Sequence, residues 1–303
     1  MAIYGLETII AKENEPLSKH STFHIGGNAK LALFPKNAEQ FVSCIKYCNN
    51  SALRFCIMGN ASNVLFDDKG YDGAIIFTTQ MNRVEYIRRK DDTLIKTDCG
   101  VSLTMLASEA GKKQSLSGLE FAYGIPGTVG GAVYMNAGAY GGQMSDVVIE
   151  SEILDINTMQ IKTVAAADHQ YGYRHSVFMD HPEQIIISTT LKLRPANAAD
   201  IFEIMNKNMA ARRDKQPLEY PSAGSVFKRP ADNVFAAKLI QDANLKGYTI
   251  GGAQISDKHS GFIINLGSAT SADVLALVEH VKSTILQTFN VALECEIIYV
   301  PYN

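Results

Sequence analysis

The amino-acid sequence predicts an α+β protein with more than one domain. A chain of 303 residues is too long for one ordinary hydrophobic core. From residue 82 to residue 194 the regular elements are strands interrupted by one helix, and helices gather after residue 195. A regular alternation of strands and helices, which would indicate a parallel dinucleotide-binding sheet, does not run through the chain.

The first predicted unit, residues 30–78, places a helix between strands. Lys30–Pro35 is apolar and extended, and Asn37 is a residue type that caps helices, here over Ala38–Asn50. The elements that follow are a strand, a loop and a strand: Arg54–Met58, Gly59–Asp68 and Gly73–Thr78. Together they indicate a small α/β unit.

The middle part of the chain is predicted to form antiparallel sheet. Many of its segments alternate polar and apolar residues, as strands with one face in water do. One helix, Ser102–Lys112, interrupts them. The predicted strands are Arg83–Arg89, Thr93–Cys99, Val147–Asn157, Gln160–Ala165 and Gln184–Leu193.

The last third of the chain is predicted to be mainly helical. The predicted helices are Ala199–Lys215, Val234–Ala243 and Ser271–Phe289. The last has Ser271 as its cap and apolar residues at helical spacing, namely Val274, Leu275, Leu277, Val278, Val281 and Ile285. The chain ends with a predicted strand, Ala292–Tyr299.

Composition and charge argue against several classes of protein. The formal net charge of −3 gives no reason to expect a nucleic-acid partner. The N-terminus lacks the basic-then-apolar layout of a secretory signal, and no apolar stretch reaches the roughly 18–20 residues that span a bilayer. We therefore expect a cytoplasmic protein without a membrane partner.

The five cysteines predict neither a disulfide framework nor a metal site, because their number is odd and they show no CxxC or Cys/His spacing. Cys44 and Cys48 lie four residues apart on a predicted helix, which is a spacing that could hold a metal. Two small, buried, apolar side chains are the simpler interpretation.

A glycine-rich run is the most distinctive feature of the sequence. Seven of the 23 glycines lie between Gly124 and Gly142. Glycine lets backbone N–H groups approach a phosphate closely, and Val129–Asn136 could begin a short helix whose N-terminus faces an anion. The alternative is a cluster of tight turns without a ligand. The run matches neither GxxxxGK[ST], because no lysine follows, nor GxGxxG with its surrounding strand and helix.

Two further loops have a similar character. Residues 58–65, MGNASNVL, follow a predicted strand and offer one hydroxyl and two side-chain amides. Residues 22–27, TFHIGG, end in two glycines. Each loop is weak evidence alone, because such loops are common. The three together, on an α/β unit followed by a β-rich unit, indicate a nucleotide cofactor held in some other way.

Seven motifs follow one another along the chain, and their sequences and order resemble those of a known family. They run from about Leu17 to Ile298 and read STFHIGG, GNASNVLFDD, GIPGTVGGAVYMNAGAYG, YGYRHSVF, PSAGSVFKRP, LKGYTIGGAQISDKHSGFIIN and LECE. The family is that of the UDP-N-acetylenolpyruvoylglucosamine reductases, FAD enzymes of peptidoglycan precursor synthesis. The short interval between Arg174 and Ser225 resembles the type that lacks a tyrosine-loop insertion.

The resemblance implies an FAD-binding fold of the vanillyl-alcohol-oxidase type with a C-terminal α+β substrate domain. The implied parts are an α/β subdomain (1–79, with a terminal strand at about 295–303 returning to it), a β-rich subdomain (80–196) and the substrate domain (197–294). The implied reaction uses NADPH to reduce FAD, and the reduced flavin converts UDP-N-acetylglucosamine enolpyruvate into UDP-N-acetylmuramate. The expected form is a monomer.

The resemblance also assigns residues to FAD. They are Gly59, Asn60, Ala61, Ser62, Asn63, Val64, Tyr123, Pro126, Gly127, Thr128, Gly130, Gly131, Asn136, Ala137, Gly138 and Gly224. Ala61 stands where a third glycine is usual, and alanine suits this position unless positive φ is needed. Asn244 also replaces a common glycine, and asparagine accepts left-handed geometry.

Three catalytic residues are implied in the same way. Negative charge builds beside the substrate carboxylate, so a fixed guanidinium lowers the barrier, and Arg174 matches the family's arginine. Ser225 matches the serine that supplies the proton. Glu296 matches the C-terminal acid, although Glu294 shares its face of the predicted strand and local sequence does not choose between them.

The residues expected to contact the substrate are Tyr173, Lys228, Arg229, Gln254 and His259. A serine hydroxyl is a poor acid, and Lys228 and Arg229 lie close enough in sequence to assist Ser225. After Glu296 comes Ile297-Ile298, where relatives often carry a basic residue, and Arg229 is the candidate to compensate.

Two other functions share part of this pattern. A different flavin oxidase or dehydrogenase would keep the phosphate loops but not Arg174, Ser225 and Glu296 in their motifs. A non-catalytic FAD-binding module would need the cofactor residues alone.

Overall fold

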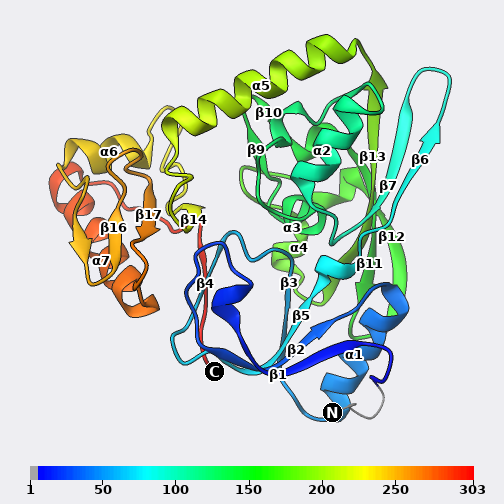
Figure 1. Cartoon of the computed structure of the whole chain (residues 1–303), viewed down its shortest axis with the longest axis horizontal. Coiled ribbons are helices and arrows are strands. Elements are labelled where there is room, and N and C mark those ends of the chain that lie inside the picture. The colour runs from blue at the N-terminus through cyan, green and yellow to red at the C-terminus, as the bar shows by residue number, and fades with distance from the viewer. Residues whose placement is uncertain (1–5) are drawn as a thin grey trace. The chain divides into compact units, whose positions relative to one another are not determined.

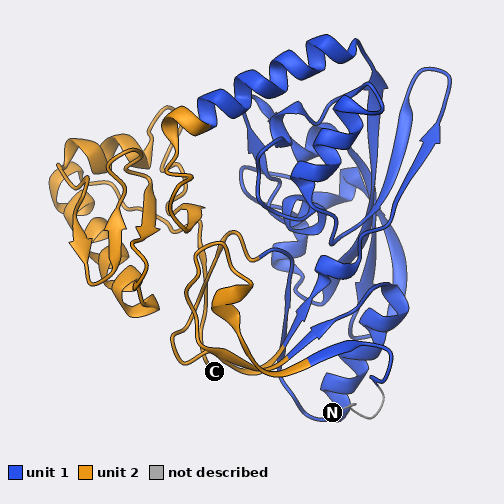
Figure 2. Cartoon of the chain, in the orientation of Figure 1, with its two compact units in different colours: residues 1–11, 32–60, 75–212 blue, residues 12–31, 61–74, 213–303 orange. Residues whose placement is uncertain are grey.

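The computed structural model describes residues 6–303, and the chain divides into two compact units (Figures 1 and 2). Among the described residues, unit 1 comprises 6–11, 32–60 and 75–212, and unit 2 comprises 12–31, 61–74 and 213–303. Each unit is therefore assembled from three separate stretches of chain.

The main sheet of unit 1 is antiparallel, with strand order β12-β11-β13-β7-β6. The long central strand β13 (Gln184–Pro195) pairs with β11 (Val148–Asp155) on one side and β7 (Thr93–Asp98) on the other. The outer strands are β12 (Gln160–Ala165) and β6 (Val84–Arg88), and the short β8 (Leu116–Ser117) also pairs with β13. Figure 1 shows β13 running the length of this sheet.

Three helices accompany the sheet in unit 1. Helix α2 (Leu103–Lys112) begins after its N-cap Ser102, whose hydroxyl accepts the Met105 N–H. Helix α3 (Val129–Tyr134) packs against β13 and β7, and it contacts the single-turn helix α4 (Val177–Asp180).

A second sheet has the order β1-β2-β5-β3, and its strands β1, β2 and β5 pass from one unit into the other. Its strands are β1 (Ile10–Pro16), β2 (Asn28–Phe34), β5 (Tyr71–Phe77) and β3 (Phe55–Met58). Helix α1 (Ala38–Asn50) starts at Asn37, whose side chain accepts the Gln40 N–H at 2.9 Å. Burial raises the pKa of Cys44 to about 12 and of Cys48 to about 11, so both are protonated, buried side chains as interpreted above.

Unit 2 contains a four-stranded sheet and two helices over one hydrophobic core. The sheet order is β14-β17-β16-β15, from Ser222–Ser225, Phe262–Asn265, Ala253–Ile255 and Thr249–Ile250 respectively. Helix α7 (Ser271–Phe289) contacts α6 (Ala236–Asp242), β15 and β16. Phe23 and Leu65, from the two N-terminal stretches of this unit, are fully buried in the same core.

The remaining elements are short or join the larger ones. They are β4 (Val64–Phe66), which pairs in parallel with β18 (Ile298–Val300), the pair β9 (Gly138–Ala139) and β10 (Gly142–Gln143), α5 (Ala198–Lys215), and the 3₁₀ helices Leu17–Lys19, Thr78–Gln80, Glu120–Ala122, Met144–Asp146 and Ala166–His169. Among residues 6–303, no helix is both long and apolar enough to cross a membrane.

The predicted helix α1 and strand β12 have the observed bounds, and three other predictions need correction. Helix α7 also has its predicted bounds, but its N-cap is Thr270, which forms a capping box with Asp273, and Ser271 is the first helical residue. The predicted loop Gly59–Asp68 contains strand β4. The predicted strand Ala292–Tyr299 is regular only in β18, because the preceding residues form a single bridge, Phe227 to Cys295.

Candidate cofactor and active-site residues

The loop between β3 and β4 has the properties of a phosphate-binding segment. Within residues 6–303, no N–H group from Gly59 to Asn63 donates a hydrogen bond to a protein acceptor. The side chains are used instead: Asn60 donates to the carbonyl of Pro126, and Asn63 donates to the carbonyl of Glu296 at 2.9 Å. Consecutive backbone N–H groups without a protein acceptor are suited to an anion such as a pyrophosphate.

Two glycines assigned to the cofactor have a packing role that the sequence did not reveal. A Cβ on Gly59 would lie 2.3 Å from Oγ1 of Thr128, and a Cβ on Gly130 would lie 2.7 Å from Cβ of Cys99. Both distances are far below van der Waals contact. Glycine is therefore needed at each position for the loops of unit 1 to pack together, whatever ligand they hold.

The N-terminus of α3 does not offer its first-turn donors to an anion. The N–H groups of Val129 and Gly130 donate to the carbonyls of Val101 and Cys99, at 2.9 and 2.8 Å. The N–H of Gly131 donates to the N-cap, Thr128, at 3.4 Å. All three donors have acceptors within the protein, so these hydrogen bonds do not support the prediction that the three N–H groups bind an anion.

The start of the glycine-rich run is held by helix α2. The Thr104 hydroxyl donates to the Ile125 carbonyl at 2.7 Å and accepts the Gly124 N–H at 3.1 Å. Nζ of Lys112 lies 3.1 Å from the Tyr123 hydroxyl and 4.7 Å from the centre of its ring. These contacts fix the residues that precede Pro126.

Residues 134–138 of the glycine-rich run form hydrogen bonds with residues 172–176, the segment that carries the predicted catalytic arginine. Asn136 is buried, and its amide donates to the carbonyl of Gly172 at 3.0 Å. The hydroxyl of Ser176 donates to the carbonyl of Tyr134 at 2.7 Å. The guanidinium of Arg174 donates to the carbonyl of Gly138 at 3.2 Å. Residues 134–138 thus contact Arg174 and the residues on both sides of it.

Arg174 itself lies in a tight turn. Gly172 and His175 exchange two backbone hydrogen bonds, so Tyr173 and Arg174 form the tip of a hairpin. Arg174 has φ +53°, which is uncommon for a non-glycine residue and costs about 1–2 kcal/mol. Its guanidinium carbon lies 5.3 Å from the centre of the Tyr173 ring, whose residue is half exposed.

Ser225 lies at a β-bulge in unit 2. Between Ser222 and Ser225, β14 advances three residues while β17 advances two, from Ile264 to Phe262. Gly224 occupies the bulge with φ +78°, and a Cβ there would meet no atom within 4 Å, so glycine is needed for its backbone conformation alone. The bulge sets the direction of Ser225.

The segment that carries Glu296 lies beside the one that carries Ser225. The Glu296 N–H donates to the Val226 carbonyl at 2.7 Å, and the Lys228 N–H donates to the Glu294 carbonyl at 2.9 Å. The Lys228 ammonium forms an ion pair with the Glu294 carboxylate. The two glutamates, which local sequence could not distinguish, therefore differ in surroundings: Glu294 pairs with Lys228, and the backbone of Glu296 lies next to Ser225–Val226.

The other residues predicted to contact the substrate all lie in unit 2. Arg229 is exposed and lies over the Phe235 ring, 5.2 Å from its centre. The Gln254 amide donates to Thr249 and to the Gly247 carbonyl, which closes the β15–β16 hairpin. These two side chains thus already contact neighbouring residues.

His259 is held as a neutral acceptor. Burial lowers its pKa, and its Nδ1 accepts the Gly261 N–H at 3.1 Å, so the ring proton lies on Nε2. The ring also packs edge-on against Phe262. At neutral pH, His259 therefore offers a hydrogen-bond donor and no charge.

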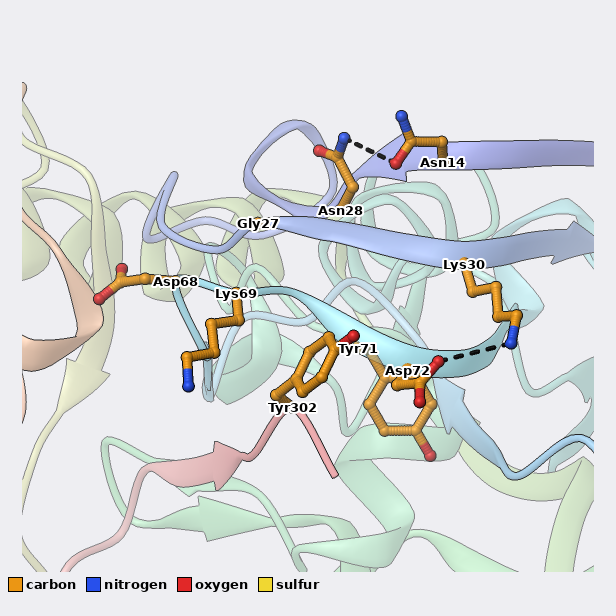
Figure 3. A pocket seen from close by; sticks show the side chains of 9 residues that line it. All are labelled: Asn14, Gly27, Asn28, Lys30, Asp68, Lys69, Tyr71, Asp72 and Tyr302. Atoms are coloured by element: carbon orange, nitrogen blue, oxygen red, sulfur yellow. Dashed lines mark hydrogen bonds and ion pairs between the residues drawn. The ribbon is translucent and has the colours of Figure 1, made fainter.

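One cavity of about 580 Å³ lies within unit 2 and contains none of the predicted site residues (Figure 3). It is lined by Asn14, Gly27, Asn28, Lys30, Asp68, Lys69, Tyr71, Asp72 and Tyr302. Its Lys30–Asp72 pair spans 3.5 Å, and the two side chains are 64% and 48% exposed. Such exposed ion pairs contribute little to the free energy of unfolding. We assign no function to this cavity.

Comparisons with known proteins point to one family along the whole chain. The model of the FAD binding domain matches residues 29–163, and the model of the UDP-N-acetylenolpyruvoylglucosamine reductase C-terminal domain matches residues 216–300. The UDP-N-acetylenolpyruvoylglucosamine reductase of Caldicellulosiruptor saccharolyticus is 45% identical over 98% of this chain and 94% of its own. That of Pediococcus pentosaceus is 41% identical over 94% of this chain and 92% of its own.

A solved structure agrees with these matches. The crystal structure of the UDP-N-acetylenolpyruvylglucosamine reductase from Thermus caldophilus aligns with a TM-score of 0.78 and 30% identity. The alignment covers 97% of this chain and 99% of the other. Neither chain therefore has a large part that the other lacks.

Proposed function

Because the chain belongs to the UDP-N-acetylenolpyruvoylglucosamine reductase family, we propose that Arg174, Ser225 and Glu296 are its catalytic residues. The chain reduces UDP-N-acetylglucosamine enolpyruvate to UDP-N-acetylmuramate, with FAD as cofactor and NADPH as reductant. The observation that carries this function is the 45% identity over 98% of the chain. The predicted α+β fold, FAD cofactor and reaction are thereby confirmed.

The proposed FAD contacts begin at the loop Gly59–Asn63, whose N–H groups fit a pyrophosphate. The other proposed contacts are Val64, Tyr123, Pro126, Gly127, Thr128, Gly130, Gly131, Ala137, Gly138 and Gly224, as the family motifs imply. When bound, FAD supplies the hydride for the reduction. The protein residues have to hold the substrate, stabilise the charge that develops on it and deliver a proton.

Arg174 is proposed to stabilise negative charge on the substrate carboxylate. A guanidinium is always charged and can form two parallel hydrogen bonds to a carboxylate. The hairpin holds its backbone in one conformation, and a charge fixed before the reaction is worth more than one that must reorganise.

Ser225 is proposed to donate the proton, and Glu296 to share the acid function. A hydroxyl loses its proton more readily beside positive charge, and Lys228 and Arg229 follow closely in sequence. Lys228 is already paired with Glu294, which favours Glu296 as the acid that acts on the substrate. Tyr173, Lys228, Arg229, Gln254 and His259 are proposed to contact the substrate.

Replacing Ser225 by alanine tests the proposal. We expect Ser225→Ala to bind FAD and to be reduced by NADPH at the parent rate, because the serine acts only on the substrate. Reoxidation of the reduced enzyme by UDP-N-acetylglucosamine enolpyruvate should slow by about 10²–10⁴-fold. Anaerobic stopped-flow absorbance of the flavin measures both half-reactions.

Ser222→Ala is the matched control, since it removes a hydroxyl from the same strand outside the proposed site. It should leave both half-reactions unchanged. Equal reoxidation rates in Ser225→Ala and the parent would remove Ser225 from the mechanism. Failure of the parent itself to respond to the substrate would contradict the function as a whole.

We also propose that the protein acts as a monomer in the cytoplasm, and that its parts are the FAD-binding subdomains 1–79 and 80–196 and a substrate domain at 197–294. Its partners are the small-molecule substrate and NADPH. Sedimentation equilibrium over a range of concentrations tests the monomer, and a mass that doubles with concentration would contradict it.

A further inference from the structure

The turn that carries Arg174 is held at both ends by one short stretch of chain, residues 134–138. On one side, Asn136 donates from its amide to the carbonyl of Gly172, 3.0 Å away. On the other, Ser176 donates from its hydroxyl to the carbonyl of Tyr134, 2.7 Å away. Gly172 and Ser176 flank the tip of the hairpin, so the two hydrogen bonds restrain it from both sides.

The burial, backbone conformation and hydrogen bonds of Asn136 suit it to hold the turn. It is 2% exposed, and its φ of +43° is one that asparagine accepts more readily than most residues. Its amide donates both hydrogens, to Gly172 and to the side chain of Gln143 at 3.3 Å, and its oxygen accepts the Ser145 N–H at 3.0 Å. Both donors are thus used within the protein, which favours a role in holding the turn over the FAD contact expected from the sequence.

Ser176 is equally enclosed. The residue is fully buried, and it precedes the single-turn helix α4. Its hydroxyl does not cap that helix, because it donates to Tyr134 instead. A buried hydroxyl that donates to a carbonyl outside its own turn fixes the position of the backbone on which it stands.

From this geometry we infer that Asn136 and Ser176 are positioning residues, which hold the Arg174 guanidinium where the substrate carboxylate binds. The inference rests on the proposed catalytic role of Arg174. The left-handed conformation of Arg174 is unfavourable by itself and persists only where surrounding structure imposes it. The Gly172–His175 pair closes the turn, the two flanking hydrogen bonds hold its ends to residues 134–138, and the Arg174–Gly138 bond orients the side chain.

Ser176→Ala is the principal test, because it removes only the hydroxyl group that bonds Tyr134 and keeps the rest of the side chain. We expect kcat with UDP-N-acetylglucosamine enolpyruvate to fall by about 10-fold or more, with a much smaller change in KM and an unchanged rate of reduction by NADPH. Hydrogen exchange of a peptide spanning residues 170–178, measured by mass spectrometry, should become faster, because the turn is no longer held.

Ser151→Ala is the matched control. Ser151 is also fully buried in unit 1, and its hydroxyl bonds that of Thr189 at 3.1 Å, away from the turn. Its loss should lower the melting temperature about as much as the loss of Ser176, without changing kcat or exchange at 170–178. A kcat for Ser176→Ala equal to that of Ser151→Ala would overturn the inference.

A double-mutant cycle with Arg174→Ala separates this inference from the proposed function. If Ser176 acts through Arg174, adding Ser176→Ala to Arg174→Ala should produce no further fall in kcat. A full additional fall would overturn the positioning role. A normal kcat in Arg174→Ala alone would instead contradict the proposed role of Arg174.

Asn136→Asp provides an independent variant of similar shape. It keeps an oxygen for the Ser145 N–H and, when ionised, loses the donor to Gly172. It should therefore reproduce the fall in kcat and the faster exchange at 170–178 seen with Ser176→Ala. Parent behaviour in both measurements would count against the inference even if Ser176→Ala failed to fold.

Discussion

Ala61 shows how one residue in the phosphate loop departs from its best local choice. The sequence left open whether this position needs positive φ, and the structure has φ +42° with the side chain buried. A left-handed conformation costs a non-glycine residue about 1–2 kcal/mol. Asn244, the other replaced glycine, has φ +58° directly after α6, where asparagine is well suited.

We expect Ala61→Gly to stabilise the folded protein by about 0.5–1 kcal/mol, since relief of strain exceeds the entropy that glycine adds to the unfolded chain. Urea unfolding of the FAD-free protein measures this change. Ala139→Gly is the control: Ala139 lies in β9 without positive φ, so glycine should destabilise there. A loss of stability in both variants would contradict the argument.

At the scale of elements, helix α7 has an N-terminus that is stabilised from outside its own sequence. The Asp68 carboxylate accepts the N–H groups of Ser271 at 2.6 Å and Ala272 at 3.1 Å. The Ser271 hydroxyl in turn accepts the Asp68 N–H at 3.0 Å. A carboxylate at this end also interacts favourably with the helix dipole.

Asp68→Ala should therefore lower the free energy of unfolding by about 1–2 kcal/mol, because two N–H groups of α7 lose their acceptor. Urea unfolding followed by circular dichroism measures the loss. Asp72→Ala removes a nearby carboxylate that forms an exposed ion pair with Lys30, and it should change stability by less than about 0.5 kcal/mol. Equal effects of the two substitutions would show that the contact with α7 is unimportant.

The elements also show what the sequence could and could not predict. Helices α1 and α7 were predicted with their observed bounds, because each has a long apolar periodicity and a polar residue at its start. Strands β4 and β14–β17 have two to four residues each, too few to show a period. Short strands of this kind depend on tertiary pairing.

The predicted site was recoverable only in part for the same physical reason. Motif matches identified Arg174, Ser225 and Glu296 as candidates. The contact of Asn136 with Gly172 joins residues 36 positions apart, and the bulge at Gly224 depends on its pairing with β17. No local pattern encodes either feature. The carbonyls that accept the first N–H groups of α3 likewise come from Cys99 and Val101, well outside the glycine-rich run.

At the scale of the whole molecule, the discontinuous units limit what can be isolated as a fragment. The C-terminal family model covers residues 216–300, but unit 2 also contains residues 12–31 and 61–74. Those two stretches supply Phe23, Ile25 and Leu65 to the core, and each is at most 2% exposed. A C-terminal fragment would expose the surfaces that these side chains cover.

We therefore expect a fragment of residues 213–303 to lack cooperative unfolding, because burial of a large apolar side chain contributes about 1.5–3 kcal/mol and three would be missing. Urea titration by circular dichroism and the dispersion of amide NMR signals test this. The full chain serves as the control for a cooperative transition. A fragment that unfolds cooperatively with the stability of the full chain would contradict the division into units.

The double restraint of the Arg174 hairpin by residues 134–138 has a consequence for sequence variation. A substitution at position 136 affects the glycine-rich run in which it lies and also the hydrogen bond that holds the Arg174 hairpin. The new residue therefore has to fit the run and keep the hairpin in place. Positions 136 and 176 should accordingly tolerate few residue types. A substitution at either position should be accompanied by substitutions in the segment to which it is hydrogen-bonded. We therefore expect substitutions in the glycine-rich run and in the hairpin to constrain one another.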